Sequence, residues 1–219
     1  YSQGHCFRCF KTKAECDLCI MKPETCHYHL GTCREDEFAH QVCFQPHIVY
    51  LANSSALKIG ITRVQNMPMR WLDQGATQAL PILKVGSRRL SGHLETLFGT
   101  QVADKTDWRK LLKGEAESLN LIEQRDQILE AFAPKIQSIR DEFSQNLEFN
   151  EGLEFLENET PREFIYPVNQ YPEKIKSLNL DKTPTIRGVL HGIKGQYLLL
   201  DIGVINIRKY TGYELILRT

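Results

Sequence analysis

The chain has 219 residues, of which 42% are hydrophobic and 25% charged, with 27 basic and 27 acidic side chains. This profile is typical of a globular protein with one large or two modest domains. A formal net charge of zero excludes a strongly basic character spread over the whole chain as the basis of nucleic-acid binding, and leaves only local basic patches for that role.

The hydropathy pattern disfavours membrane and secreted proteins. No apolar run approaches the roughly 18 to 20 residues that span a bilayer. No basic start followed by an apolar stretch marks a signal peptide. We therefore expect a cytoplasmic protein with no membrane partner. Because the chain opens on Tyr1 rather than Met, we also expect native residues before it, and these would matter for counting metal ligands.

Residues 1–46 contain every cysteine of the chain, namely Cys6, Cys9, Cys16, Cys19, Cys26, Cys33 and Cys43. The first four form two Cys-x-x-Cys pairs. Such a knuckle aims two thiolates at one tetrahedral ion, whereas a disulfide across it would be strained. A reducing compartment keeps the thiols free, and the segment has few large apolar side chains with which to fold by burial. The pattern predicts a module held by structural Zn²⁺, with all seven cysteines as candidate ligands.

The spacing allows two ways of sharing these ligands. In the first, one site takes Cys6, Cys9, Cys16 and Cys19, and a second takes Cys26, Cys33, Cys43 and one of His27, His29 or His40. In the second, one site takes Cys16, Cys19, Cys26 and Cys33, and Cys6 and Cys9 pair with a knuckle before Tyr1. We favour the second grouping.

The composition changes at residue 47, because no cysteine and only two of the histidines lie beyond it. Residues 47–52 and 57–62 predict two strands joined by a turn at 53–55, which is a β-hairpin. Asn66 is expected to cap a short helix at 69–74 that stops at Gly75. A strand at 79–85 follows, and Ser91 is expected to cap a helix. The apolar face of that helix carries Leu94, Leu97, Phe98 and Val102.

This order of elements, with the residues it carries, resembles the GIY-YIG nuclease superfamily. The resemblance implies an active site made by Tyr50 on the first strand, Gly60 on the second, Arg70 on the first helix and Glu95 on the later helix, where Glu95 binds a metal ion. Arg63 is a nearby second candidate for the arginine. All of these lie in residues 47–114, which the resemblance assigns to one α/β core.

The chain departs from the superfamily at the second tyrosine, where it has Lys58. Divergent branches also carry Lys-Ile-Gly-x-Thr at this point. In such a site Glu95 would hold one Mg²⁺ or Mn²⁺, Arg70 would neutralise charge on the phosphoryl oxygens, and Tyr50 would orient or deprotonate the attacking water. Lys58 adds a positive charge, but it cannot reproduce the hydrogen bonding of a phenol. Taken singly, each of these residues reads as an ordinary core or surface side chain.

A wider resemblance covers nearly the whole chain. It rests on the stretches CDLCIMKPETC (16–26), GTCR (31–34), VYLANSS (49–55), LKIGITR (57–63), RWLDQGA (70–76) and GIKGQY (192–197). These look like a bacterial family classified only as a domain of unknown function. The resemblance implies a shared architecture more than an activity.

The remaining sequence predicts a long helix and a β unit. Residues 115–146 are rich in helix formers, and Leu129, Phe132, Ile136, Ile139 and Phe143 share one face, which favours packing within the chain over dimerisation. Residues 185–193, 196–201, 204–208 and 213–217 predict strands of an antiparallel meander or small barrel. Its basic residues are either a nucleic-acid surface or solvated charges at a sheet edge; they are Arg187, Lys194, Arg208, Lys209 and Arg218.

Together these patterns predict an α+β protein with four segments: a zinc module at 1–46, the GIY-YIG-like core at 47–114 with a three-stranded antiparallel sheet, a helical segment at 115–160 and a β unit at 161–219. The leading function is metal-dependent cleavage of phosphodiester bonds in DNA or RNA. The alternative is a zinc-containing module that binds nucleic acid or protein on a degenerate nuclease fold. A factor that modifies RNA is a third class that no residue selects.

Overall fold

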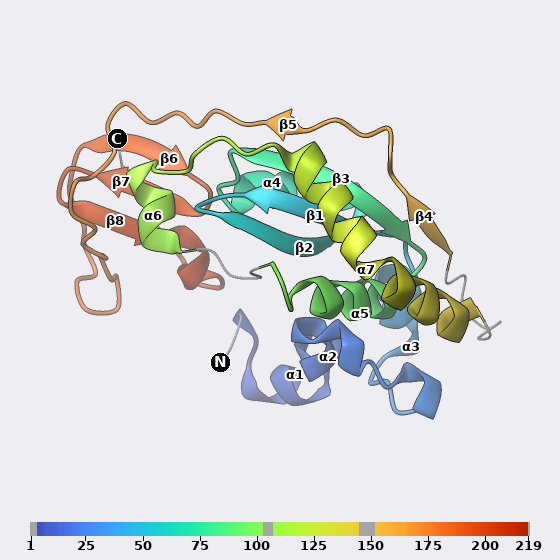
Figure 1. Cartoon of the computed structure of the whole chain (residues 1–219). Helices are drawn as coiled ribbons and strands as arrows, with labels where there is room; N and C mark the ends of the chain where they lie inside the picture. The colour runs from blue at the N-terminus through green and yellow to red at the C-terminus, as the bar shows by residue number, and fades with distance from the viewer. Residues whose placement is uncertain (1–3, 103–106, 145–151, 219) are drawn as a thin grey trace.

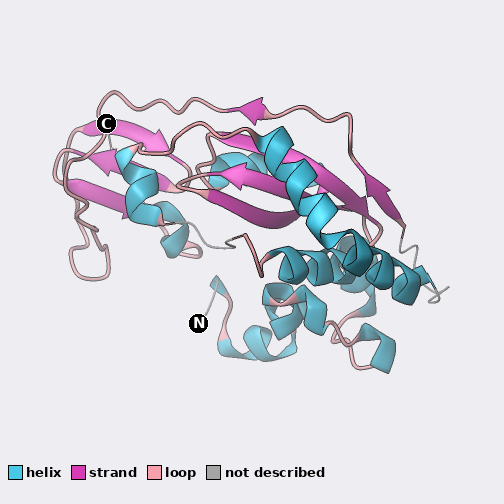
Figure 2. Cartoon of the chain, in the orientation of Figure 1, coloured by secondary structure: helices cyan, strands magenta, loops and turns pink. Residues whose placement is uncertain are grey.

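The computed structural model describes residues 4–102, 107–144 and 152–218. The N-terminal residues 4–46, called the cysteine module from here on, form a series of short helical turns (Figures 1 and 2). These turns are α1 (Phe7–Thr12), η2 (Ala14–Cys16), α2 (Leu18–Met21), η3 (Pro23–Thr25), η4 (Tyr28–Leu30), α3 (Asp36–Phe38) and η5 (Ala39–Cys43). Tyr1 and the residues next to it lie outside the described part of the chain.

An antiparallel sheet forms the centre of the protein. Its strands are β1 (His47–Asn53), β2 (Leu57–Arg63), β3 (Gln78–Val85), β4 (Leu153–Phe155) and β5 (Arg162–Glu163). The order is β2-β1-β3-β4, and β5 also pairs with β3. The predicted hairpin and third strand are confirmed. The sheet is larger than expected, because β4 and β5 belong to a strap that returns along β3 after the long helix.

Helices cover the two faces of this sheet unequally. The helices are α4 (Met69–Asp73), α5 (Arg88–Phe98), α6 (Trp108–Lys113) and α7 (Leu121–Ser144), and η6 (Val64–Asn66) precedes α4. One face of the sheet packs against α5 and α7 in the larger core. The other face packs Ile48, Tyr50 and Ala52 against Trp71 of α4. Figure 1 shows the cysteine module lying against α5 on the side away from the sheet.

The long helix packs within the chain, as the sequence predicts. Phe132, Ile136 and Phe143 are buried in the larger core, and Leu129 and Ile139 pack against it. The helix begins at Leu121 rather than near residue 115, because residues 115–120 form no helix. The last two residues of the expected helix, 145 and 146, lie outside the described residues.

The C-terminal β unit is a three-stranded antiparallel meander of β6 (Leu190–Lys194), β7 (Tyr197–Leu200) and β8 (Gly203–Asn206), followed by η7 (Ile207–Tyr210). The expected strand at 213–217 is wrong, since this segment is exposed and forms no strand. Leu112 of α6 packs against Leu199 and Val204 of the meander. The basic surface predicted here also loses one member, because Lys194 is only 1% exposed and lies over the rings of Tyr166 and Tyr171.

These elements confirm the predicted α+β class, with two antiparallel sheets, a long helix and a small C-terminal sheet. In the three described stretches of the chain, no helix is long and apolar enough to span a bilayer.

Two predicted helix caps are wrong. Asn66 lies in the η6 turn, and Pro68 occupies the N-cap position of α4. Helix α5 starts a turn before Ser91: the Ser87 hydroxyl accepts a hydrogen bond from the backbone N–H of Leu90 at 3.1 Å. Ser91 lies inside the helix and donates to the carbonyl of Arg88. The sequence offers two serines four residues apart, and only the path of the chain leaving β3 decides between them.

This difference can be measured by unfolding in urea. We expect Ser87→Ala to lower the free energy of unfolding by about 1 to 2 kcal/mol, because it leaves an N–H at the helix start unpaired. Ser91→Ala is the matched control, and it should change stability by less than about 0.5 kcal/mol, since alanine favours the helix interior. A larger loss for Ser91→Ala than for Ser87→Ala would contradict the observed helix start.

Candidate active site and cysteine cluster

Tyr50 and Gly60 lie directly opposite each other on β1 and β2. The Tyr50 side chain is fully buried and crosses the bare backbone of Gly60. A Cβ atom at position 60 would lie 2.7 Å from the Tyr50 hydroxyl oxygen. Glycine is therefore required here for close approach, since a methyl group would occupy the space of the phenol.

Two further side chains bond to the Tyr50 hydroxyl, and the charge of a third acts on it. It donates a hydrogen bond to Oε1 of Gln74 at 2.9 Å, and the guanidinium of Arg70 also bonds to it. Burial raises the pKa of Tyr50 to about 12, and the nearby Glu95 carboxylate adds to this effect while Arg70 opposes it. Arg70 of α4 thus meets Tyr50 of β1 at the hydroxyl, and the charge of Glu95 on α5 acts on the same group. At neutral pH the phenol keeps its proton.

The other two candidates occupy different positions. Arg63 lies opposite His47 on the sheet, and its charge acts on His47 and Arg88. It therefore belongs to a neighbouring cluster, and Arg70 is the arginine that reaches Tyr50. Lys58 of β2 lies on the same face of the sheet as Tyr50, because it is paired with Ala52 of β1. It is only 5% exposed. The burial of Lys58 limits how far its ammonium group can reach.

In the cysteine module, four thiols surround one small cavity of about 20 Å³. They belong to Cys19, Cys26, Cys33 and Cys43. Burial raises the pKa of Cys19 to about 11 and that of Cys43 to about 12, and the neighbouring thiols of the same group add to both effects. A cation in the cavity would reverse this, because metals bind the thiolate form. The chemistry and spacing of these donors therefore fit a soft metal ion.

The other three cysteines lie apart from this cavity. Cys6 and Cys9 are neighbours in one turn, where the Cys9 N–H donates to the Cys6 sulfur at 3.4 Å, and Cys16 acts electrostatically on Cys9. The arrangement matches neither grouping drawn from spacing. Cys43 takes the place that the favoured grouping gave to Cys16, because the π-helical turn η5 lines the cavity and ends at Cys43. His29 and His40 do not line the cavity.

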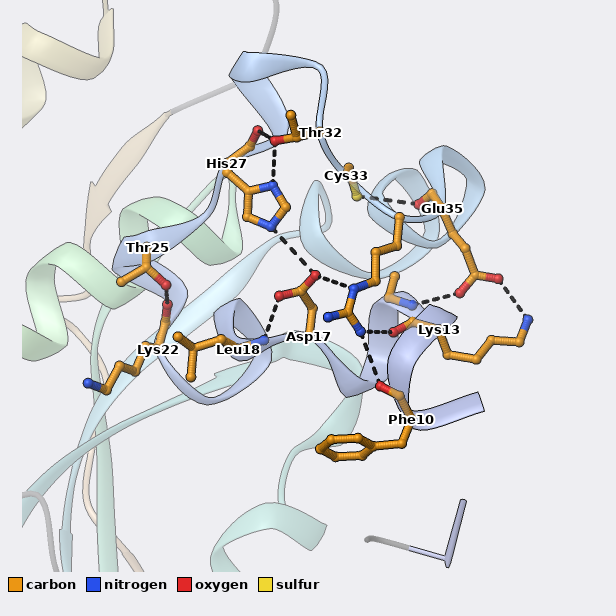
Figure 3. Close-up of polar contacts among 12 residues, drawn as sticks. Phe10, Lys13, Asp17, Leu18, Lys22, Thr25, His27, Thr32, Cys33 and Glu35 are labelled. Carbon is orange, nitrogen blue, oxygen red and sulfur yellow. Dashed lines mark hydrogen bonds and ion pairs between the residues drawn. The ribbon is translucent and has the colours of Figure 1, made fainter. Parts of the chain in front are cut away.

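A second set of possible ligands lies beside the cavity. Ligand atoms of Asp17, Cys19 and His27 lie within 4.8 Å of one another. Figure 3 shows that Asp17 is already engaged: its carboxylate receives the Leu18 N–H at 2.6 Å and lies 3.5 Å from His27. It also pairs with Arg34 at 2.7 Å. The module can thus hold a metal ion, and its four free thiols compete for that ion with a carboxylate that already has partners.

Sequence reasoning missed Gln74 and Arg88. Nothing in the pattern marks Gln74, which becomes the partner of Tyr50 only when α4 folds onto the sheet. The position of Arg88 could have indicated an interaction. A positive charge in the first turn of a helix is repelled by the helix dipole, so it needs a stabilising partner elsewhere. The guanidinium of Arg88 donates to the carbonyl of Ile20 in α2 at 2.6 Å. Burial lowers its pKa, and the Cys43 thiol and Glu95 carboxylate oppose that change.

Comparison with known proteins identifies a family. A family described as "Protein of unknown function (DUF2797)" matches residues 1–215. This confirms the wider resemblance seen in the sequence. Neither the curated proteins nor the solved structures contain a match to the chain.

The contact between Tyr50 and Gly60 can be tested by substitution. We expect Gly60→Ala to lower the free energy of unfolding by about 1 to 3 kcal/mol, because the added methyl group overpacks a site where the phenol cannot move aside. In a Tyr50→Leu background, whose side chain ends short of Gly60, the same change should cost less than about 0.5 kcal/mol. Equal costs in the two backgrounds, measured by urea unfolding, would show that the two residues are not in contact.

Proposed function

The chain belongs to the DUF2797 family of proteins of unknown function, and we propose that it is a metal-dependent nuclease that cleaves phosphodiester bonds in DNA or RNA with a GIY-YIG-type site. The observation that carries the proposal is that Arg70 bonds to the Tyr50 hydroxyl while the charge of Glu95 acts on the same group. These residues are distant in sequence, and two of them lie on helices whose other faces pack into separate cores. Core packing alone gives no reason for a guanidinium and a carboxylate to act on one buried phenol.

Glu95 is the residue that would hold Mg²⁺ or Mn²⁺. It is half-buried, and a single carboxylate suffices because Mg²⁺ keeps several waters and completes its shell with phosphate oxygens. The bound ion would polarise the scissile phosphoryl group. Arg70, also half-buried, would neutralise the charge that develops on the phosphoryl oxygens.

Tyr50 takes the orienting role rather than that of a base. Its pKa of about 12 keeps the phenol protonated at neutral pH, so it is a poor acceptor for a proton from water. Its hydroxyl instead ties Arg70 to Gln74, which fixes the direction of the guanidinium. We therefore assign Tyr50 as a positioning residue for Arg70.

The alternative is a binding module on a nuclease fold that has lost its chemistry. Two observations favour it: Lys58 stands in place of the second tyrosine, and Tyr50 itself has no exposed surface. Such a module would still bring Arg70 to a nucleic-acid backbone. It would bind DNA or RNA with a salt-dependent affinity and leave the strand intact.

A cleavage assay separates the two functions. We expect the full chain with Mg²⁺ or Mn²⁺ to cut members of a panel of structured DNA and RNA, and Glu95→Gln to lower kcat by roughly 100-fold or more, because it removes the metal ligand at constant shape. Glu130→Gln, a change to an exposed carboxylate on α7, is the matched control and should keep full activity. Cleavage by Glu95→Gln at the parental rate would refute the nuclease proposal. Binding without cleavage by the parent would assign the binding module.

For the cysteine module we propose a structural Zn²⁺ bound by the thiolates of Cys19, Cys26, Cys33 and Cys43. Four thiolates favour Zn²⁺ over the hard ions expected at Glu95. The module also buries few apolar side chains, so metal binding would supply much of its folding energy. Cys6, Cys9 and Cys16 are candidate ligands of a second Zn²⁺, whose ligand set these three do not complete.

Metal analysis of purified variants identifies the ligands. We expect Cys43→Ser to lose about one equivalent of zinc and His27→Gln to retain it, because the first removes a thiolate and the second only a neighbour of the cavity. Inductively coupled plasma mass spectrometry measures the content directly. Loss of zinc from His27→Gln together with retention in Cys43→Ser would assign the metal to the group of Asp17, Cys19 and His27.

A further inference from the structure

We propose that the metal-loaded cysteine module positions Glu95 by holding the face of α5 that carries it, with Arg88 as the linking residue. This inference rests on the proposed nuclease function for its consequence in catalysis. Its structural part, that the module holds α5, stands on contacts that do not depend on any activity.

The module touches α5 at two points. Nη2 of Arg88 donates a 2.6 Å hydrogen bond to the backbone carbonyl of Ile20, the residue after Cys19. One turn further along the helix, Gly92 lies against η3: a Cβ atom there would lie 2.6 Å from Cβ of Pro23 and 2.7 Å from the backbone nitrogen of Glu24. The backbone of the module therefore rests directly on the backbone of the helix, so a shift of either one must move the other.

These contacts lie on the same side of α5 as the candidate metal ligand of the active site. Arg88, Gly92 and Glu95 stand at positions i, i+4 and i+7, which share one face of an α-helix. The opposite face of α5 carries Leu90, Leu94 and Phe98 into the core. Helix α5 thus lies between the sheet and the cysteine module. The module covers the two turns of α5 that precede Glu95.

Electrostatics tie Arg88 to both sites. Its guanidinium is largely buried, and the Cys19 and Cys43 thiols and the Glu95 carboxylate all act on its charge. A buried cation needs a compensating charge. Four thiolates around one Zn²⁺ carry a net negative charge, whereas four protonated thiols carry none. Metal loading would therefore supply the negative charge that holds Arg88 in contact with α2. Charged residues around metal centres commonly interact with the metal ligands in this way.

Apolar burial contributes little to the shape of the module. Its buried side chains are small, namely Ala14, Cys16, Pro23 and Ala39. Without metal, the turns that present the Ile20 carbonyl and the Pro23 surface would loosen, and α5 would lose its outer support. Glu95 would then lose its fixed distance from Arg70 and Tyr50.

Hydrogen exchange of α5 tests the structural part. Compared with the zinc-loaded full chain, zinc-depleted protein should exchange the amides of α5 about tenfold faster or more, with α7 little changed. Arg88→Gln should raise α5 exchange in the same direction while keeping its zinc, and Gly92→Ala should do likewise by pushing η3 away. Arg89→Gln is the matched control, because Arg89 lies over Phe143 of α7 and not over the module. It should leave α5 exchange within about twofold of the parent.

Kinetics test the catalytic part. Arg88→Gln should lower kcat about tenfold or more with KM little changed, since it misplaces a group that acts in the transition state. Unchanged α5 exchange in both the zinc-depleted protein and Arg88→Gln would overturn the proposal. Faster α5 exchange with an unchanged kcat would overturn the catalytic part of the proposal. A rise in KM alone would also overturn it, and would assign the module to substrate docking. If the parent cleaves nothing, the nuclease proposal fails, and the exchange result still decides whether the module holds α5.

Discussion

The close approach of the Tyr50 ring to the backbone of Gly60 is the constraint on which the candidate site depends. Two adjacent strands could pair in the same register with many residues at position 60, but only glycine leaves room for the phenol. Seated there, the hydroxyl reaches Gln74 at the end of α4, and the same helix brings Arg70 to the ring. The site is thus organised around a buried hydroxyl, and the charged groups are arranged at its rim.

The chain separates two kinds of metal chemistry by its order along the sequence. Soft thiolates are confined to the first 46 residues, and the hard carboxylate proposed for Mg²⁺ or Mn²⁺ comes later, on α5. This separation would keep the two proposed ions from competing for the same ligands, because zinc prefers sulfur and Mg²⁺ prefers oxygen. The two regions nevertheless meet in space at α5, where Arg88 bonds to the Ile20 carbonyl of the cysteine module and feels the charge of Glu95.

The C-terminal meander contacts α4, the helix that carries Arg70. The turn between β6 and β7 presses on the end of α4, where a Cβ at Gly195 would lie 2.9 Å from the carbonyl oxygen of Asp73. Tyr166, which follows β5, donates to the carbonyls of Leu72 and Ala76 at the same end of α4. Helix α4 is therefore held at its C-terminal end by residues from a distant part of the chain, which helps to fix the direction of Arg70 and Gln74.

The sequence by itself determined the α+β class, the hairpin, the packing face of the long helix, the gathering of all cysteines in one segment and the membership of a family. These follow from local periodicity, turn residues and continuous motifs, which act over a few residues at a time. Tertiary structure decided which serine starts α5, that β4 and β5 return to β3, that 213–217 forms no strand, and that Cys43 rather than Cys16 joins the thiols of Cys19, Cys26 and Cys33. It also brought Arg88 to Ile20 and Glu95 toward Tyr50. Each of these depends on contacts between segments far apart in the chain, and neither spacing nor propensity encodes such a contact until the sheet and its helices have packed.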